Sequence, residues 1–110
     1  MTLSKDLVAA SSVPLLLGIL CEGQSYGYAI AKRVRELSGD AIQWSEGMLY
    51  PVLHRLEQQG LVESSWQDSE SGRRRRYYRI TRQGRGELER QREQWELVRR
   101  TLDRTWRPGE

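Results

Sequence analysis

The hydrophobic period of the chain changes at Leu61, and this change constrains the fold more than any other feature. Residues 61–66 and 76–80 are rich in residues that favour β-strands. Between them, residues 68–72 read Asp-Ser-Glu-Ser-Gly, a composition typical of turns. We therefore predict a β-hairpin between segments of helical period. The resulting fold class is mainly α with a β-hairpin (α+β).

Two helices are predicted in the first forty residues. The first contains the apolar run 13–20 and begins as early as Ser4, although Pro14 would then kink or break it. The second has Ser25 as its N-cap and Gly39 as its stop, because these residue types favour the two ends of a helix. Both helices carry apolar residues at helical spacing, which predicts that each buries one side.

The third predicted helix has one buried side and one free side. It begins at Ser45, and Gly60 closes it. Its apolar stripe consists of Leu49, Val52, Leu53 and Leu56. Its opposite side presents Gly47, Tyr50, His54 and Arg55. The helix can therefore pack against a core and still offer a surface to a partner.

A last helix is predicted from Thr81 to about Trp106. It carries a near-heptad stripe formed by Leu88, Trp95, Val98 and Leu102. So small a chain leaves this stripe without a partner, so we expect a second copy to cover it around a two-fold axis. Tryptophans facing each other there would form a flat slot for a planar ligand. The alternative is that Trp95 is an ordinary core residue.

The composition excludes several classes of protein. The 110 residues are too few for a large enzyme fold, and no apolar stretch reaches the eighteen residues of a membrane span. One cysteine and one histidine exclude an internal disulfide and a Cys/His zinc site. Neither Cys21 nor His54 has an orienting partner, so we expect no catalytic residue, no metal and no cofactor. Since the first ten residues lack the features of a signal peptide, we expect a cytoplasmic protein.

Positive charge is concentrated after residue 60. Residues 1–60 contain five basic and six acidic residues, whereas residues 61–80 contain five and three. Sixteen of the eighteen basic residues are arginine, whose forked guanidinium suits phosphate and guanine. The densest run, Arg73 to Arg76, either contacts DNA phosphates beside Tyr77 and Tyr78 or is a solvated turn neutralised by Asp68 and Glu70. If the strand begins early, Arg74 and Arg76 point away from the side of Arg75.

Three helices, a hairpin and a final helix are the layout of a winged helix-turn-helix. In this fold the third helix enters the major groove and the hairpin, or wing, touches the flanking backbone. The expected groove contacts are Ser45, Gly47, Met48 and Tyr50. The expected phosphate contacts are Lys32, Arg55, Arg73, Arg74, Arg75, Arg76 and Tyr77. Residues 1–81 would form the DNA-binding domain, and residues 82–110 a dimerisation helix with a short tail.

Such a dimer would bind double-stranded DNA with a pseudo-palindromic operator. Two alternatives stay open. One is a generic α+β domain in which the polar side of the third helix is exposed to solvent and binds nothing. The other is a winged-helix adaptor that docks proteins without binding DNA.

Three segments of the chain resemble the PadR family of transcriptional regulators. They are Tyr26–Arg33, Ser45–Val62 and Gly72–Thr81, followed by Gly84. The most specific part is the motif L-Y-P-x-L-x-R-L-E-x-x-G, which begins at Leu49, together with the R-x-Y-Y-R strand. The resemblance extends from about Val13 to Gly84 and so covers most of the chain.

The resemblance implies a homodimeric bacterial repressor that a small effector releases from DNA. It also implies the short subfamily, which dimerises through a single final helix. Trp95 matches a tryptophan that stacks on flat aromatic compounds in multidrug-responsive members. By the same analogy the first helix lines the pocket with Leu7, Ala10, Val13 and Leu17. The expected interface residues on the last helix are Leu88, Trp95, Val98, Arg99 and Leu102.

Two residues depart from the family pattern. Met48 stands where the family usually has a small threonine, so we expect it to touch a thymine methyl group rather than to supply a hydroxyl. Arg99 lies one turn beyond Trp95, which predicts a pocket that prefers neutral or anionic aromatic compounds to cationic dyes.

Overall fold

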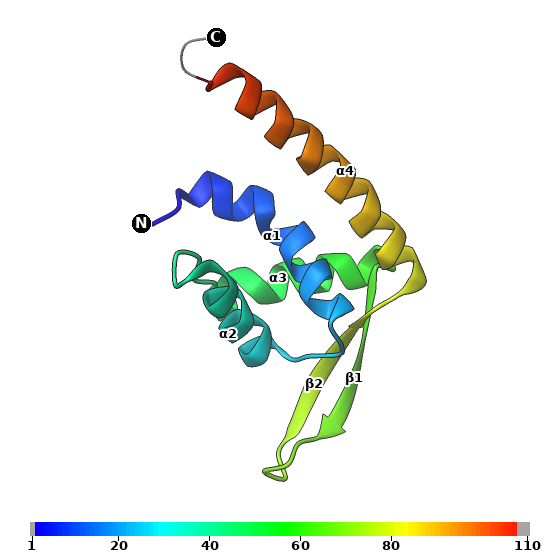
Figure 1. Ribbon diagram of the computed structural model, residues 1–110. Helices are drawn as coiled ribbons and strands as arrows, with labels where there is room; N and C mark the ends of the chain where they lie inside the picture. The colour runs from blue at the N-terminus through cyan, green and yellow to red at the C-terminus, as the bar shows by residue number, and fades with distance from the viewer. Residues whose placement is uncertain (1, 108–110) are drawn as a thin grey trace.

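The computed structural model describes residues 2–107 and arranges them as helices around the base of a hairpin (Figure 1). The elements are α1 (Lys5–Cys21), α2 (Gly27–Ser38), α3 (Glu46–Gln58), β1 (Val62–Asp68), β2 (Arg74–Ile80) and α4 (Arg82–Thr105). The predicted order of three helices, hairpin and final helix is confirmed. The end of the expected C-terminal tail, residues 108–110, lies outside the described residues.

The helix ends follow local capping signals. Ser4 caps α1 by accepting a hydrogen bond from the Leu7 amide (3.2 Å), and Pro14 does not break this helix. Ser45 caps α3 in the same way through the Met48 amide (3.2 Å). Gly39 ends α2 in the left-handed conformation, at φ 59°. The predicted ends at Ser45 and Gly39 and the early start of the first helix near Ser4 are confirmed, whereas the predicted break at Pro14 is wrong.

The predicted start of α2 is wrong by one residue. Tyr26, and not Ser25, is the N-cap of this helix. The backbone of Ser25 is engaged elsewhere, because its amide donates to the Tyr78 carbonyl (3.0 Å) and its carbonyl accepts from the Tyr78 amide (2.7 Å). This bridge joins the segment before α2 to strand β2. No local sequence pattern predicts this contact, because its two residues are far apart in the chain.

The core lies between α1, α2, α3 and the base of the antiparallel hairpin. Its most completely buried side chains are Leu16, Leu17, Leu20, Ile30, Val34, Leu49, Leu53, Leu56 and Val62. The predicted apolar stripe of α3 is buried throughout, which confirms the orientation of this helix. Among residues 2–107, no helix is long and apolar enough to cross a membrane.

Helix α4 begins on the hairpin base and then leaves the body of the protein. Thr81 caps it by accepting from the Gly84 amide (3.0 Å) and donates to the Gly60 carbonyl (2.7 Å). The first part of α4 packs against α1 and buries Leu88, whereas the second part projects away from the other helices (Figure 1). The expectation that α4 lacks a partner within its own chain is therefore wrong for its N-terminal part.

Candidate nucleic-acid interface

The first half of α3 presents a free surface on the side of the hairpin. Ser45 and Gly47 are exposed at its start, and the Tyr50 side chain retains 43% of its accessible surface. The Tyr50 ring lies over the first residue of α2, since a Cβ added to Gly27 would be 2.5 Å from the phenol oxygen. The absence of a side chain at Gly27 thus lets Tyr50 lie directly against the α2 backbone.

A groove of about 660 Å³ separates this surface from the hairpin. Its walls combine aromatic rings and guanidinium groups, supplied by Tyr26, Tyr28, Tyr50, Trp66, Tyr78 and Arg73 to Arg76, with Glu46 and Gly27 completing the lining. Only one carboxylate lines the groove among the described residues, so the groove is strongly cationic. A cationic groove attracts a polyanion, and the exposed polar groups of the neighbouring helix can bind a polyanion that also presents hydrogen-bond donors and acceptors.

The four arginines of the wing lie in different environments. Strand β2 begins at Arg74, so Arg74 and Arg76 share one face of the hairpin and Arg75 lies on the other, as the early-strand prediction requires. The Arg75 guanidinium lies 4.3 Å from the centre of the Tyr26 ring, and that of Arg74 lies 6.0 Å from the Trp66 ring. Arg73 is exposed in the turn that precedes β2.

Arg76 is paired with a carboxylate of the neighbouring helix. Its Nη2 lies 3.1 Å from Oε1 of Glu57 on α3. By contrast, neither Asp68 nor Glu70 forms an ion pair within the described part of the chain, although Asp68 is the cross-strand partner of Arg74.

The two tyrosines of β2 differ in accessibility. Tyr77 is half-buried and makes an edge-to-face contact with Tyr26, with ring centres 5.4 Å apart. Tyr78 is only 5% exposed, and burial raises the pKa of its phenol. Tyr77 is therefore the more accessible of the two, and Tyr78 anchors the wing to the core.

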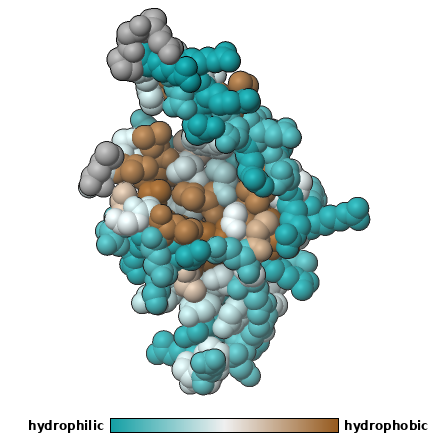
Figure 2. All heavy atoms as spheres, in the orientation of Figure 1, coloured by the Kyte–Doolittle hydropathy of each residue, from teal (hydrophilic) through white to brown (hydrophobic). Residues whose placement is uncertain are grey.

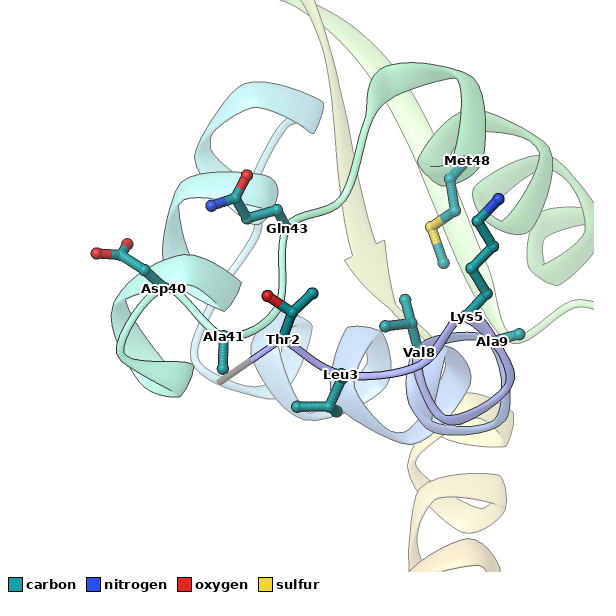
Figure 3. A pocket seen from close by; sticks show the side chains of 9 residues that line it. All are labelled: Thr2, Leu3, Lys5, Val8, Ala9, Asp40, Ala41, Gln43 and Met48. Atoms are coloured by element: carbon teal, nitrogen blue, oxygen red, sulfur yellow. The ribbon is translucent and has the colours of Figure 1, made fainter.

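Met48 lies on the opposite flank of α3 from Tyr50. Its side chain points toward Val8 and Ala9 of α1 and lines an apolar hollow of about 520 Å³ (Figure 3). The side chain is half-buried and packs against the hydrophobic core. Met48 thus lies on the flank of the helix beside α1 and away from the groove, so this position does not support the expected contact with a thymine methyl group.

The two phosphate contacts expected outside the wing lie apart from the groove. Arg55 shares the flank of Met48 and lines a separate hollow between the end of α3 and the start of α4, next to Glu87 and Arg90. Lys32 is exposed on α2 beside Glu22 and Glu36. The structure therefore does not bring either residue together with the wing arginines.

Trp66 and Tyr28 belong to the groove although sequence reasoning did not select them. Trp66 is 58% exposed on β1 and is the cross-strand partner of Arg76, and Tyr28 is 63% exposed on the first turn of α2. The sequence did contain a signal for Trp66. Because side chains alternate along a strand, Trp66 lies on the same face of β1 as Ser64 and Val62.

The projecting half of α4 exposes an apolar stripe. Trp95, Val98 and Leu102 retain 38%, 47% and 37% of their surface and border a hollow of about 480 Å³. Figure 2 shows a further apolar patch over α1, next to the largely hydrophilic α4. Of the α1 residues expected there, Leu7 and Ala10 are exposed and Val13 is half-buried.

Leu17 and Leu88, which we expected at the same interface, are instead buried in the core of their own chain. They are therefore not available to line a slot between two copies.

Arg99 does not carry a free charge into this hollow. Its guanidinium pairs with Glu96 (2.8 Å) and with Asp103 (3.1 Å). The hydrogen bond from Arg99 lowers the pKa of Glu96, so this carboxylate stays ionised at neutral pH and compensates the arginine. This pairing weakens the argument for the predicted preference for neutral or anionic aromatic compounds over cationic dyes, because that argument took Arg99 as a free positive charge.

The two candidate catalytic side chains, His54 and Cys21, do not line the groove. Among residues 2–107, no three His, Cys, Asp or Glu side chains lie close enough together to hold a metal ion. His54 is exposed on α3, and the Cys21 sulfur receives a weak contact from Arg85 at 3.6 Å.

The sequence matches a family model described as the transcriptional regulator PadR-like family over residues 16–90. Two curated relatives are similar to the chain. Uncharacterized protein X of Lysinibacillus sphaericus is 30% identical over 98 residues, which are 89% of this chain and 90% of that protein. The transcriptional regulator Rv3488 of Mycobacterium tuberculosis is 48% identical over 69 residues, which are 62% of this chain and 64% of that protein.

Solved structures show the same fold along almost the whole chain. A transcriptional regulator from Clostridium thermocellum superimposes with a TM-score of 0.87 at 32% identity, covering 96% of this chain and all of the other. A PadR-like transcriptional regulator from Bacillus cereus gives 0.82 at 27% identity with the same coverage. The predicted winged helix-turn-helix fold is confirmed by these likenesses.

Proposed function

The chain belongs to the PadR-like family of transcriptional regulators and is not an enzyme, and we propose that it acts as a homodimeric repressor in the cytoplasm. In this proposal it binds a pseudo-palindromic operator and a small aromatic effector releases it. The observation that carries the proposal is the cationic groove between α3 and the hairpin. In this groove the exposed face of α3 lies next to the wing arginines. A helix that enters the DNA major groove while a wing contacts the flanking phosphates requires this arrangement.

We assign DNA contacts by position. Ser45, Gly47 and Tyr50 face the base edges from α3, because they form the free surface of this helix. Arg73, Arg74, Arg75 and Tyr77 approach the phosphates from the wing, and Lys32 contributes from α2. Residues 1–81 then form the DNA-binding part and residues 82–110 the dimerisation part.

The apolar stripe of α4 supports the dimer. Trp95, Val98 and Leu102 are exposed on the part of α4 that projects from the body, and the apolar patch over α1 lies beside it (Figure 2). Burying these side chains against a second copy removes apolar surface from water, which stabilises association by about 25 cal/mol per Å² before the cost of ordering.

The hollow beside Trp95 supports an effector site between the two copies, with the indole as its stacking surface. We expect Trp95→Ala to lower the affinity for a flat aromatic compound such as a flavonoid by about tenfold, since aromatic pairs contribute roughly 0.5–1.5 kcal/mol beyond area burial. Fluorescence titration measures this affinity. Trp66→Ala, which removes an exposed tryptophan outside the stripe, is the control and should bind the compound as the unmodified protein does.

The contribution of the wing is tested by the salt dependence of DNA binding. We expect the double variant Arg73→Ala/Arg74→Ala to flatten the slope of log affinity against log salt by about 1.8 per chain, or about 3.6 for the homodimer, because each phosphate contact contributes roughly 0.9. The variant Arg100→Ala/Arg104→Ala removes equal charge from α4, whose projecting end lies on the opposite side of the molecule from the wing (Figure 1). It should leave the slope unchanged.

The same titration separates the repressor from a protein-docking adaptor. An adaptor would show no salt-dependent affinity for duplex DNA in the unmodified protein. An unchanged slope in Arg73→Ala/Arg74→Ala would instead remove the wing from the set of DNA contacts while leaving DNA binding intact.

A further inference from the structure

Three polar side chains join α3 to both strands of the hairpin. The Ser64 hydroxyl of β1 donates to Oε2 of Glu57 (2.6 Å), and Arg76 of β2 donates from Nη2 to Oε1 of the same carboxylate (3.1 Å). Arg76 also donates from Nε to the Ser64 hydroxyl oxygen (3.0 Å). The three contacts form a closed triangle, which we call the wing clamp and define as Glu57, Ser64 and Arg76.

The wing clamp occupies the face of the hairpin that looks toward α3. Ser64 and Arg76 lie on one face of the sheet, because their cross-strand partners are Tyr78 and Trp66. The Glu57 side chain is only 28% exposed, and the Arg76 guanidinium lies 5.8 Å from the centre of the buried Tyr78 ring. Partial burial makes these charged hydrogen bonds stronger than those of a fully solvated pair.

The opposite face of the hairpin and the outer edge of β2 are held by different contacts. The side chains of Gln24 and Gln67 exchange hydrogen bonds at 3.2 Å, and the backbones of Ser25 and Tyr78 form the bridge described above. These contacts fix the hairpin to the segment before α2. Helix α3 lines the other wall of the groove. Among the described residues, only the wing clamp joins the hairpin to α3 through hydrogen bonds between side chains.

We propose that Arg76 is a positioning residue that sets the angle between the wing and α3, and that it does not contact DNA phosphate. The inference rests on the proposed function, since the angle matters only for a wing and a helix that bind the same duplex. Arg73, Arg74 and Arg75 have no carboxylate partner in the described chain, whereas the charge of Arg76 is compensated by Glu57. The run of four arginines thus divides into three that are available to phosphates and one whose charge is compensated within the chain.

The angle itself is tested without DNA. Spin labels at Gln58→Cys on α3 and Ser71→Cys at the hairpin tip, in a Cys21→Ser background diluted with unlabelled chain, report the distance between helix and wing. We expect the distance distribution to broaden in Arg76→Ala and in Glu57→Gln. Arg79→Ala is the matched control, because Arg79 pairs with Glu63 of the same hairpin (2.9 Å) and leaves the clamp intact; its distribution should keep the width of the unmodified protein.

The DNA measurements separate positioning from phosphate contact. We expect Arg76→Ala to lower the ratio of operator to random-sequence affinity by roughly tenfold, the equivalent of one lost charge-assisted hydrogen bond. Its salt slope should stay unchanged, whereas Arg73→Ala, which removes one contact from each of the two chains, should flatten the slope by about 1.8 and keep the ratio. Glu57→Gln removes the negative charge that compensates Arg76. We therefore expect this variant to bind random-sequence DNA at least as tightly as the unmodified protein does, while the ratio of operator to random-sequence affinity falls.

Two results would overturn the proposal. One is a slope that flattens by about 1.8 in the dimer of Arg76→Ala, which would make Arg76 a phosphate contact. The other is an unchanged distance distribution in both clamp variants. If the unmodified protein failed to bind DNA at all, the proposed function would fall, but the distance measurement would still decide whether the clamp holds the wing.

Discussion

Replacing Leu102 with aspartate is expected to turn the dimer into a monomer and to abolish high-affinity operator binding. Leu102 lies on the exposed stripe of α4 with Trp95 and Val98, so a charge there would be buried without a partner if two copies associated. A single copy reads one half-site only. Joining two half-sites in one molecule raises overall affinity by roughly 10²- to 10⁴-fold, and we expect the variant to lose this factor.

The chain offers a closely matched control in Leu97→Asp. Leu97 is 60% exposed and, at 100° per residue, lies on the opposite side of α4 from the stripe. It should remain dimeric and bind the operator normally. Sedimentation equilibrium gives the oligomeric state, and circular dichroism checks that both variants keep their helices. If Leu102→Asp sedimented as a dimer, or if Leu97→Asp dissociated equally, the stripe would not be the dimer interface.

Replacing Gly84 with alanine is expected to give the largest loss of stability among the glycine substitutions. A Cβ at this position would overlap the Leu61 carbonyl oxygen and lie 2.7 Å from Cγ1 of Ile80. That carbonyl accepts the hydrogen bond from the Thr81 amide (3.0 Å), so relieving the overlap disturbs the junction between hairpin and α4. We expect the free energy of unfolding to fall by about 1–3 kcal/mol or more, as overpacking of a backbone contact does.

Gly86→Ala is the control for this prediction. Gly86 lies in the same turn of α4, but a Cβ there would meet no atom within 4 Å. The substitution should stabilise the helix by roughly 0.5–1 kcal/mol, because alanine loses less backbone freedom than glycine. Chemical denaturation followed by circular dichroism measures both changes. Equal stability of the two variants would show that α4 does not pack closely on the hairpin base.

Features decided by neighbours in sequence were predictable from the chain itself. The caps Ser4 and Ser45 each accept a hydrogen bond from the amide three residues later, and Gly39 reverses the chain at the end of α2. The hairpin followed from its β-forming runs and turn cluster, although the strands extend further, to Asp68 and from Arg74. Such signals are complete within a few residues and need no knowledge of the tertiary packing.

The flanks of α3 could not be assigned in the same way. Tyr50 and Glu57 are seven residues apart and share the flank beside the hairpin, whereas Met48 and Arg55 share the other flank, beside α1 and the start of α4. The apolar stripe shows which side of the helix is buried. It does not show which flank the wing approaches, because that depends on how the hairpin docks.

Charged residues posed the same difficulty. The run Arg73 to Arg76 is uniform in sequence, yet only Arg76 pairs with Glu57, which lies nineteen residues earlier in the chain. Likewise Leu88 belongs to the predicted stripe of α4, but α1 buries it within its own chain. In each case a partner distant in sequence determines what the residue does.

The central claim is that paired copies place two α3 helices into successive turns of one duplex. Selection of bound duplexes from a random pool at near-physiological salt tests it most directly. We predict enrichment of two inverted half-sites whose centres are about 34 Å, or roughly 10 base pairs, apart, bound by two chains per duplex. Recovery of a lone half-site bound by one chain, or no enriched sequence at all, would contradict the account.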